Sequence, residues 1–196
     1  MERGLILKKG TIVDSTIISA PSSTKNKEKK RDPDAHQVKK GNTWHFGYKA
    51  HIGVDRDSGL VHTVEATAAN VHDATETSKL LTGDEDEVYG DSGYLGAEKR
   101  GDAIIRNKAG RKIKYRINRR PSQVKKLSKS GQYAAKKAEH AKSSVRAKVE
   151  HAFGVVKKQL RFRKTRYRGL EKQRAKFNIM FALANLLLAD RPCLAA

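Results

Sequence analysis

The sequence contains one cysteine, Cys193, and no long hydrophobic run. A single thiol forms neither a disulfide framework nor a cysteine zinc site, so the disulfide-rich secreted domains and the zinc fingers are excluded. We find no signal peptide and no stretch of about 18 apolar residues. We therefore expect a soluble protein of a reducing compartment such as the cytoplasm, which does not associate with membranes.

Acidic residues are also scarce relative to basic ones. The 196 residues include 42 Lys and Arg against 21 Asp and Glu, which gives a formal net charge of +21. Such an excess predicts a polyanionic partner, and nucleic acid is the first choice. Hydrophobic residues still make up 37% of the chain, which is enough for one folded domain with a core.

The few acids are unevenly distributed. Ten of the 21 fall within residues 54–91, whereas the stretch between Asp102 and Glu171 has 23 Lys and Arg but only two acids, Glu139 and Glu150. A protein that only binds nucleic acid has little need to concentrate acids in this way. An enzyme that holds cations beside phosphates does need some carboxylates.

The hydrophobic pattern predicts an α/β fold in the order β-β-β-α-β, then a basic region, then α-α. Strands are expected at 11–18, 44–55, 59–69 and 87–96, with a hairpin turn at Arg56–Gly59 and a Gly-rich turn at the end of the last strand. Residues 21–42 read as a long basic loop. Helices are expected at 72–81 with Asp73 as the cap, from 97 onward, at 143–160, and at 170–190 before Pro192. The segment from about 106 to 142 reads as basic and irregular.

Two acids interrupt apolar strand-like runs: Asp14 in IVDSTII and Asp91 in VYGDSGY. A buried carboxylate is costly unless it is paired, hydrogen-bonded or bound to a metal. If the two strands are neighbours, their carboxylates can converge at the carboxyl ends of the strands, where open α/β sheets bind ligands. The simpler alternative is that each acid only caps a turn.

The helix expected at 143–160 carries two lines of side chains. The apolar line predicts the core-facing side, and it consists of Val145, Val149, Phe153, Val156 and Leu160. Arg146, Glu150 and Lys157 form a second line about 80° around the helix. A plain Arg146–Glu150 pair, worth about 0.3–0.5 kcal/mol, is the simpler alternative. Gly154 lies on the polar side, where a glycine costs about 1 kcal/mol relative to alanine, which suggests that a neighbour needs the space.

The blocks GTIVDSTIISAPSSTKN, WHFGYKAHIGVD, HTVEATAANVHD, VYGDSGYLG and VRAKVEHAFGVVKK together resemble the bacterial insertion-sequence DDE transposases of the fifth insertion-sequence family. The resemblance extends over roughly residues 8–190, with the blocks in the family order. It implies a ribonuclease H-like fold, that is, a mixed central sheet flanked by helices.

The resemblance assigns the three metal-binding, catalytic carboxylates to Asp14, Asp91 and Glu150. In related transposases the glutamate helix carries a tyrosine, arginine, glutamate and lysine signature. Arg146, Glu150 and Lys157 match its last three members and Ser143 stands at the tyrosine position. Arg146 and Lys157 would then contact DNA phosphates. The implied cofactor is Mg²⁺, as two ions with Mn²⁺ as a substitute, which assist the in-line displacements at phosphorus.

Double-stranded DNA, as element ends and target, is the partner implied by the resemblance, and a homodimer or larger complex on DNA is typical of such enzymes. The run KKQLRFRKTRYR at 157–168 supplies basic residues for the DNA backbone, with Phe162 and Tyr167 interleaved among them. A merely solvated basic face is the alternative. The predicted DNA contacts in this part of the chain are Arg146, Lys157, Lys158, Arg161, Arg163, Lys164 and Arg166.

The chain begins about ten residues before the first catalytic strand, where family members usually carry a helical DNA-recognition region. The resemblance thus predicts a leader remnant at 1–10, a catalytic domain at 11–190 with a basic loop at 21–42 and a basic insertion or linker at 106–142, and a tail at 191–196. The predicted activity is metal-dependent phosphodiester hydrolysis and strand transfer in a nucleoid-associated protein. The alternatives are a non-catalytic basic DNA-binding protein, including an inactive transposase fragment, and another nuclease on the same fold.

Overall fold

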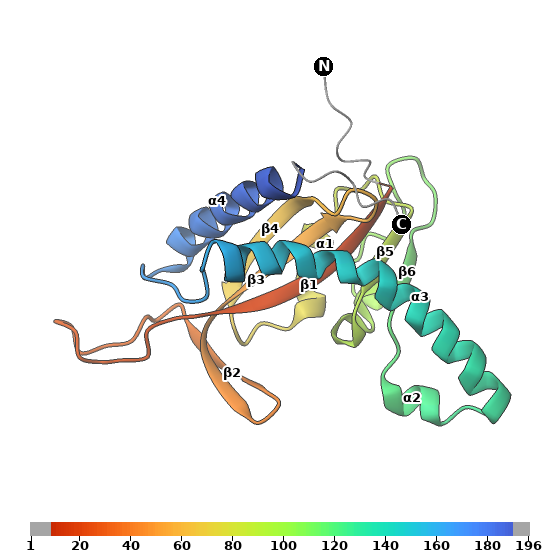
Figure 1. Ribbon diagram of the computed structural model, residues 1–196, viewed down its shortest axis with the longest axis horizontal. Helices are drawn as coiled ribbons and strands as arrows, with labels where there is room; N and C mark the ends of the chain where they lie inside the picture. Colours follow the sequence, from red (N-terminus) through yellow and green to blue (C-terminus); the bar gives the residue numbers. More distant parts are fainter. Residues whose placement is uncertain (1–8, 190–196) are drawn as a thin grey trace, which may run out of the picture.

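The computed structural model describes residues 9–189 and has a mixed sheet with helices packed against it (Figure 1). Cys193 and Pro192 lie outside the described residues. Six strands form the sheet: β1 (Gly10–Ser19), β2 (His36–Lys40), β3 (Thr43–Asp55), β4 (Val61–Ala68), β5 (Glu87–Gly90) and β6 (Lys114–Ile117). Their order is β2-β3-β1-β5-β6, and β4 pairs with β3.

Antiparallel and parallel pairings meet at β1, the strand that carries Asp14. β3 is antiparallel to β1, β2 and β4, whereas β5 is parallel to β1 and β6 is parallel to β5. The β3–β4 hairpin turn matches the prediction: Asp55 Oδ2 accepts hydrogen bonds from the Ser58 N–H and hydroxyl, both at 2.9 Å, and Gly59 takes a positive φ of 73°. This mixed α/β arrangement is consistent with a ribonuclease H-like DDE domain.

The two faces of the sheet are covered by different elements. α3 (Lys129–Gly154), the π-helical turn η4 (Val155–Gln159) and α4 (Leu170–Ala189) pack on one face. The main core lies between them and the sheet, and it contains Val149, Phe153 and Val156 of the predicted apolar line, with Val145 and Leu160 packed at its edge. A smaller cluster around Val13 and Leu80 lies on the other face, next to the short helix α1 (Thr77–Leu80).

Successive side chains of β1 alternate between these two cores. Ile12 and Ile18 belong to the main core and Val13 to the smaller one. Asp14, an even position like Ile12 and Ile18, therefore lies on the α3 side of the sheet. Its pairing with Arg146 of α3, described below, agrees with this placement.

Several predicted elements need correction in the middle of the chain. The loop prediction for 21–42 is wrong in part, because His36–Lys40 forms β2 and pairs with the start of β3. The helix expected from 97 is only the 3-10 turn η3 (Ala97–Lys99). Asp73 does not cap the next helix, since Nδ1 of His72 accepts the hydrogen bond from the Ala74 N–H at the start of η1 (Asp73–Glu76).

The prediction of an irregular basic segment through residue 142 is also wrong. β6 extends the central sheet, α2 (Pro121–Lys125) follows, and α3 begins at Lys129 rather than 143. β6 (KYRI) is half exposed and carries charged side chains, so its sequence lacks the apolar pattern that would have predicted a strand. In Figure 1 the first turns of α3, together with α2, extend away from the sheet.

Candidate active site

Asp14 lies on β1 and Asp91 directly follows the neighbouring strand β5, so the condition under which the two carboxylates can converge is met. The parallel register pairs Gly10 with Glu87 and Ile12 with Tyr89, so the same register continued by two residues sets Asp14 beside Asp91. Asp14 lies within β1 rather than at its end, whereas Asp91 directly follows β5.

Asp91 does cap a turn, which was the simpler alternative for this residue. Its Oδ1 accepts a hydrogen bond of 2.7 Å from the Gly93 N–H at the start of η2 (Ser92–Tyr94). A carboxylate has about four acceptor sites in all. Capping therefore leaves most of the acceptor capacity of Asp91 for another ligand.

α3 brings Arg146 and Glu150 to the same place. Nη2 of Arg146 lies 3.3 Å from Oδ2 of Asp14, and both side chains are mostly buried. The alternative of an Arg146–Glu150 pair is therefore wrong in this structure: the guanidinium is paired with the strand acid. Within residues 9–189, the exposed Glu150 side chain makes no hydrogen bond and no ion pair.

The electrostatics of Asp14 reflect this grouping. Burial raises the pKa of Asp14 to about 6; the Ser15 N–H and Arg146 oppose the rise, and the charges of Asp91 and Glu150 add to it. The Ser15 N–H donates to Asp14 Oδ1 at 2.7 Å. The carboxylates of Asp91 and Glu150, at the end of β5 and on α3, thus lie near enough to repel the charge of Asp14, and Arg146 and the Ser15 N–H partly offset that repulsion.

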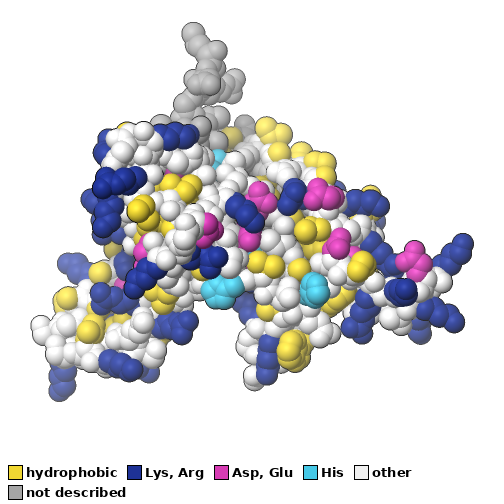
Figure 2. Space-filling view, turned by 180° about the vertical axis from the view of Figure 1, so that it is seen from behind, with side chains coloured by type: hydrophobic (Ala, Val, Ile, Leu, Met, Phe, Trp, Pro, Cys, Tyr) yellow, Lys and Arg dark blue, Asp and Glu magenta, His cyan; other side chains and the backbone are white. Residues whose placement is uncertain are grey.

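Of the seven predicted DNA-contacting residues, Arg146 lies on α3 and the other six follow α3 along the chain. Lys157 is half-buried in η4, and burial together with Lys40 and Arg163 lowers its pKa. The remaining five are exposed, and they are Lys158, Arg161, Arg163, Lys164 and Arg166. Figure 2 shows, on the face seen from behind, Lys and Arg gathered mainly at the two ends and most acids between them.

Gly154 does not make room for a neighbour among the described residues. A Cβ built at this position meets nothing within 4 Å. The expectation of a close packing partner is therefore wrong for this part of the structure, and any need for space at Gly154 has to come from a bound molecule.

A polar network next to Asp14 was not assigned from the sequence. Oδ1 of Asp73 accepts hydrogen bonds from the Ser15 hydroxyl at 2.8 Å and from Lys49 Nζ at 3.0 Å. Burial alone would raise the pKa of Asp73, but the hydrogen bonds from Lys49 and Ser15 outweigh it and hold the pKa below its usual value. Burial lowers the pKa of the adjacent His51 to about 4, so this imidazole is neutral at pH 7.

Tyr94 completes the surroundings of the site. It is 1% exposed, and its pKa is raised well above the usual value by burial and by the charges of Asp14, Asp73 and Asp91. The only signal for this network in the sequence was the Asp73-containing block ANVHD. The partners of Asp73 depend on strand register, which pairs Ser15 with His51 and Ile17 with Lys49.

The chain belongs to the transposase DDE domain family, whose model matches residues 6–186. It is therefore a transposase-family protein, with DNA as the partner and a nuclease-type activity implied by the family. No solved structure matches it. In the part of the chain described here, no helix is long and apolar enough to cross a membrane.

The three carboxylates are of the ligand type that a divalent cation prefers, because hard cations bind oxygen ligands. A cation would also offset the buried charge of Asp14, which lies near the like charges of Asp91 and Glu150. The three carboxylates do not yet form a ligand cage. Among residues 9–189, no group of three His, Cys, Asp or Glu side chains has a spacing that would hold a metal ion. The Arg146 guanidinium occupies the position beside Asp14 that a cation would compete for.

Proposed function

We propose that this chain is the catalytic domain of an insertion-sequence DDE transposase with a ribonuclease H-like fold, and that the domain spans residues 11–190. Its activity would be phosphodiester hydrolysis followed by transfer of the freed 3′-hydroxyl to target DNA. The observation that carries the proposal is the buried Asp14, whose pKa is raised to about 6 between Asp91 and Glu150. A domain that only binds DNA gains nothing from placing a carboxylate there.

Asp14, Asp91 and Glu150 would hold the metal ions. Bound Mg²⁺, or Mn²⁺ in its place, would activate the attacking oxygen and stabilise the leaving one. The described side chains contribute position and charge. Arg146 neutralises Asp14 until DNA and cations bind. Its guanidinium can then form a bidentate contact with a phosphate.

The basic residues that follow α3 would bind the DNA backbone. Lys157, Lys158, Arg161, Arg163, Lys164 and Arg166 run from η4 into the next loop, so a duplex held at Asp14 would contact them through its backbone. Such contacts neutralise phosphates and position the DNA without reading its sequence. A homodimer or larger complex on DNA, with the basic segment 25–40 as a clamp, belongs to the same proposal.

The test is metal-dependent nicking of supercoiled plasmid at low salt. The unmodified chain should nick with Mn²⁺ or Mg²⁺ and not in EDTA, and Glu150→Gln should abolish nicking while DNA affinity stays within twofold. Glu171→Gln is the matched control, because Glu171 is a helical acid that is 80% exposed at its side chain, and it should nick normally.

Two results would count against the proposal. Nicking by Glu150→Gln at the normal rate would remove Glu150 from the site. DNA binding without nicking by any variant would favour the alternative function, a DNA-binding protein in which the Arg146–Asp14 ion pair is the permanent state of the site.

A further inference from the structure

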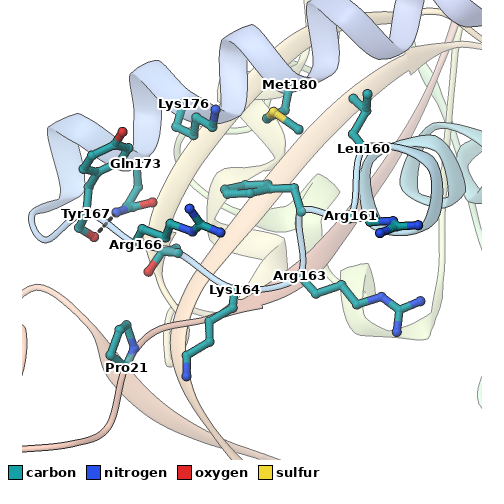
Figure 3. Close-up of a pocket in the computed structure, with 12 residues that line it drawn as sticks. Pro21, Leu160, Arg161, Arg163, Lys164, Arg166, Tyr167, Gln173, Lys176 and Met180 are labelled. Carbon is teal, nitrogen blue, oxygen red and sulfur yellow. Dashed lines mark hydrogen bonds between the residues drawn. The ribbon is translucent and has the colours of Figure 1, made fainter.

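A basic cavity lies at the far end of β1 from Asp14, outside the candidate active site. It has a volume of about 800 Å³ and is lined by Pro21, Leu160, Arg161, Phe162, Arg163, Lys164, Thr165, Arg166, Tyr167, Gln173, Lys176 and Met180. Figure 3 shows Arg161 and Arg163 on one side of it, Tyr167 and Gln173 at the opposite end, and Lys176 and Met180 reaching in from α4.

The loop that forms this cavity is fixed to the end of β1. The Ser19 N–H donates to the Arg163 carbonyl at 3.1 Å, and the Thr165 N–H donates to the Ser19 carbonyl at 2.8 Å. Arg161, where the loop leaves η4, takes a positive φ of 53°. Such a backbone is uncommon for residues other than glycine and is often found at binding sites.

Two polar groups in the wall of the cavity are buried and have no hydrogen-bond partner among residues 9–189. Gln173 is 0% exposed and Thr165 is 2% exposed, and the atoms without a partner in this part of the chain are Gln173 Oε1 and Thr165 Oγ1. The Gln173 amide nitrogen is held by the Tyr167 carbonyl, which fixes the amide so that its oxygen is the free group. Unpaired buried polar atoms are rare in folded proteins and call for a ligand or another explanation.

The chemistry of these groups restricts the class of ligand that the cavity can bind. Gln173 Oε1 only accepts hydrogen bonds, so a phosphate alone does not satisfy it, whereas the N–H groups of a nucleobase do. A base within a duplex offers its free amino N–H only at the edge of a groove, and it stays in the stack, so only a base outside the stack can present its N–H groups inside a cavity. Tyr167 is 60% exposed at the rim and offers a stacking surface, and the surrounding Arg and Lys suit the phosphates.

The distance to Asp14 also fits a single DNA molecule. Ser19 is five residues beyond Asp14 on the same strand, which corresponds to about 17 Å at 3.3 Å per residue. DNA rises 3.4 Å per base pair, so this is about five base pairs. DNA bound at the candidate active site and running along β1 would therefore reach the cavity.

We propose that this cavity binds an unpaired nucleotide of the DNA, about five positions from the scissile phosphate, with its base between Tyr167 and the buried Gln173 and Thr165 and its phosphates on the exposed Arg and Lys. The proposal rests on the proposed function for the identity of the polyanion. It goes beyond that function in assigning a site for a single-stranded or extruded base, separate from the duplex contacts.

The experiment compares the affinity for two labelled DNA probes in EDTA, by fluorescence anisotropy at about 100 mM salt. One probe is a paired 20-base-pair duplex, and the other is the same duplex with one unpaired 2-aminopurine. The unmodified chain should prefer the second probe about tenfold, and the 2-aminopurine fluorescence should change on binding. Because base stacking on an aromatic side chain contributes strongly, Tyr167→Ser should remove at least fivefold of that preference.

Two further variants sharpen the result. Tyr133→Ser is the matched control, because Tyr133 is 76% exposed on α3 and away from the cavity wall, and it should keep the full preference. Thr165→Val removes a hydroxyl that has no partner within the described residues, so folding should not suffer and the preference should fall at least twofold. Gln173 is left unchanged because its amide nitrogen holds the loop.

Equal affinity of the unmodified chain for both probes would overturn the inference. So would a loss of affinity by Tyr167→Ser that is equal for both probes, because Tyr167 would then act only on the duplex. The test involves neither metal nor cleavage, and its outcome is therefore separable from the proposed function. A preference for the probe with the unpaired base, without nicking, would contradict the catalytic proposal alone. Nicking without that preference would contradict this inference alone.

Discussion

Asp14 should lower the stability of the protein at neutral pH, and Asp14→Asn should therefore stabilise it. The pKa of Asp14 is raised from 3.8 to about 6, and burial is the main cause. Because the protonated form is favoured in the folded state, the contribution of Asp14 to stability is favourable below about pH 4 and is lost as the pH rises through 6.

The magnitude follows from the shift of about 2 pKa units, each equivalent to about 1.4 kcal/mol. Ionised Asp14 thus costs the fold about 3 kcal/mol above pH 6. The side chain is only 15% exposed, so solvent screening reduces this figure little. For a chain of this size the cost corresponds to about 6–12 °C in Tm.

The assay is thermal unfolding in EDTA at pH 8 and at pH 4.5. Asp14→Asn should have the higher Tm at pH 8, and the difference should shrink toward pH 4.5, where wild-type Asp14 is mostly protonated. Nicking should be lost in the same variant. Asp84→Asn is the control: Asp84 forms an exposed ion pair with Lys108, so its removal should change stability by no more than about 0.5 kcal/mol.

The reasoning is refuted if Asp14→Asn is no more stable than the wild type at pH 8. That result would mean that the ion pair with Arg146 outweighs the burial of the charge.

Three other substitutions test separate parts of the structure. Gly154→Ala should raise the free energy of unfolding in urea by about 1 kcal/mol, because Gly154 has helical angles of −60° and −46° and open space at its Cβ; an unchanged or lower value would contradict this. Glu85→Gln should lower the same quantity by about 1–3 kcal/mol, because the buried carboxylate accepts from the Thr82 and Gly83 N–H groups and the Thr11 hydroxyl, and an amide N–H would face those donors. Lys164→Ala should make the plot of log affinity for duplex DNA against log salt shallower by about 0.9; an unchanged slope would show that Lys164 contacts no phosphate.

The parts of the candidate site that depend on local sequence patterns could be predicted from the sequence. Asp14 and Asp91 interrupt apolar runs rich in β-branched and aromatic residues, and such local patterns favour strands. Glu150 was found because helical periodicity places it on one line with Arg146. Once β1 and β5 are parallel neighbours, the two aspartates meet.

What the sequence did not predict depends on tertiary structure. β6 is short and half exposed, so its pattern resembles that of a charged loop, and α3 begins early because Ser128 caps it by accepting from the Gly131 N–H. The pairing of Arg146 with Asp14 rather than with Glu150 joins residues 132 positions apart. The ties of Asp73 to Ser15 and Lys49 follow from the register of β1 against β3, which no local pattern encodes.

The distances along the chain between the three carboxylates have a consequence during protein synthesis. At 5–20 residues per second, the ribosome makes Arg146 and its neighbour Glu150 about 7–26 s after Asp14. A nascent chain that lacks α3 has its first two acids but neither the third nor the guanidinium that neutralises Asp14. The candidate active site therefore forms late, and an unfinished chain carries two of its three carboxylates without the third and without the guanidinium that pairs with Asp14.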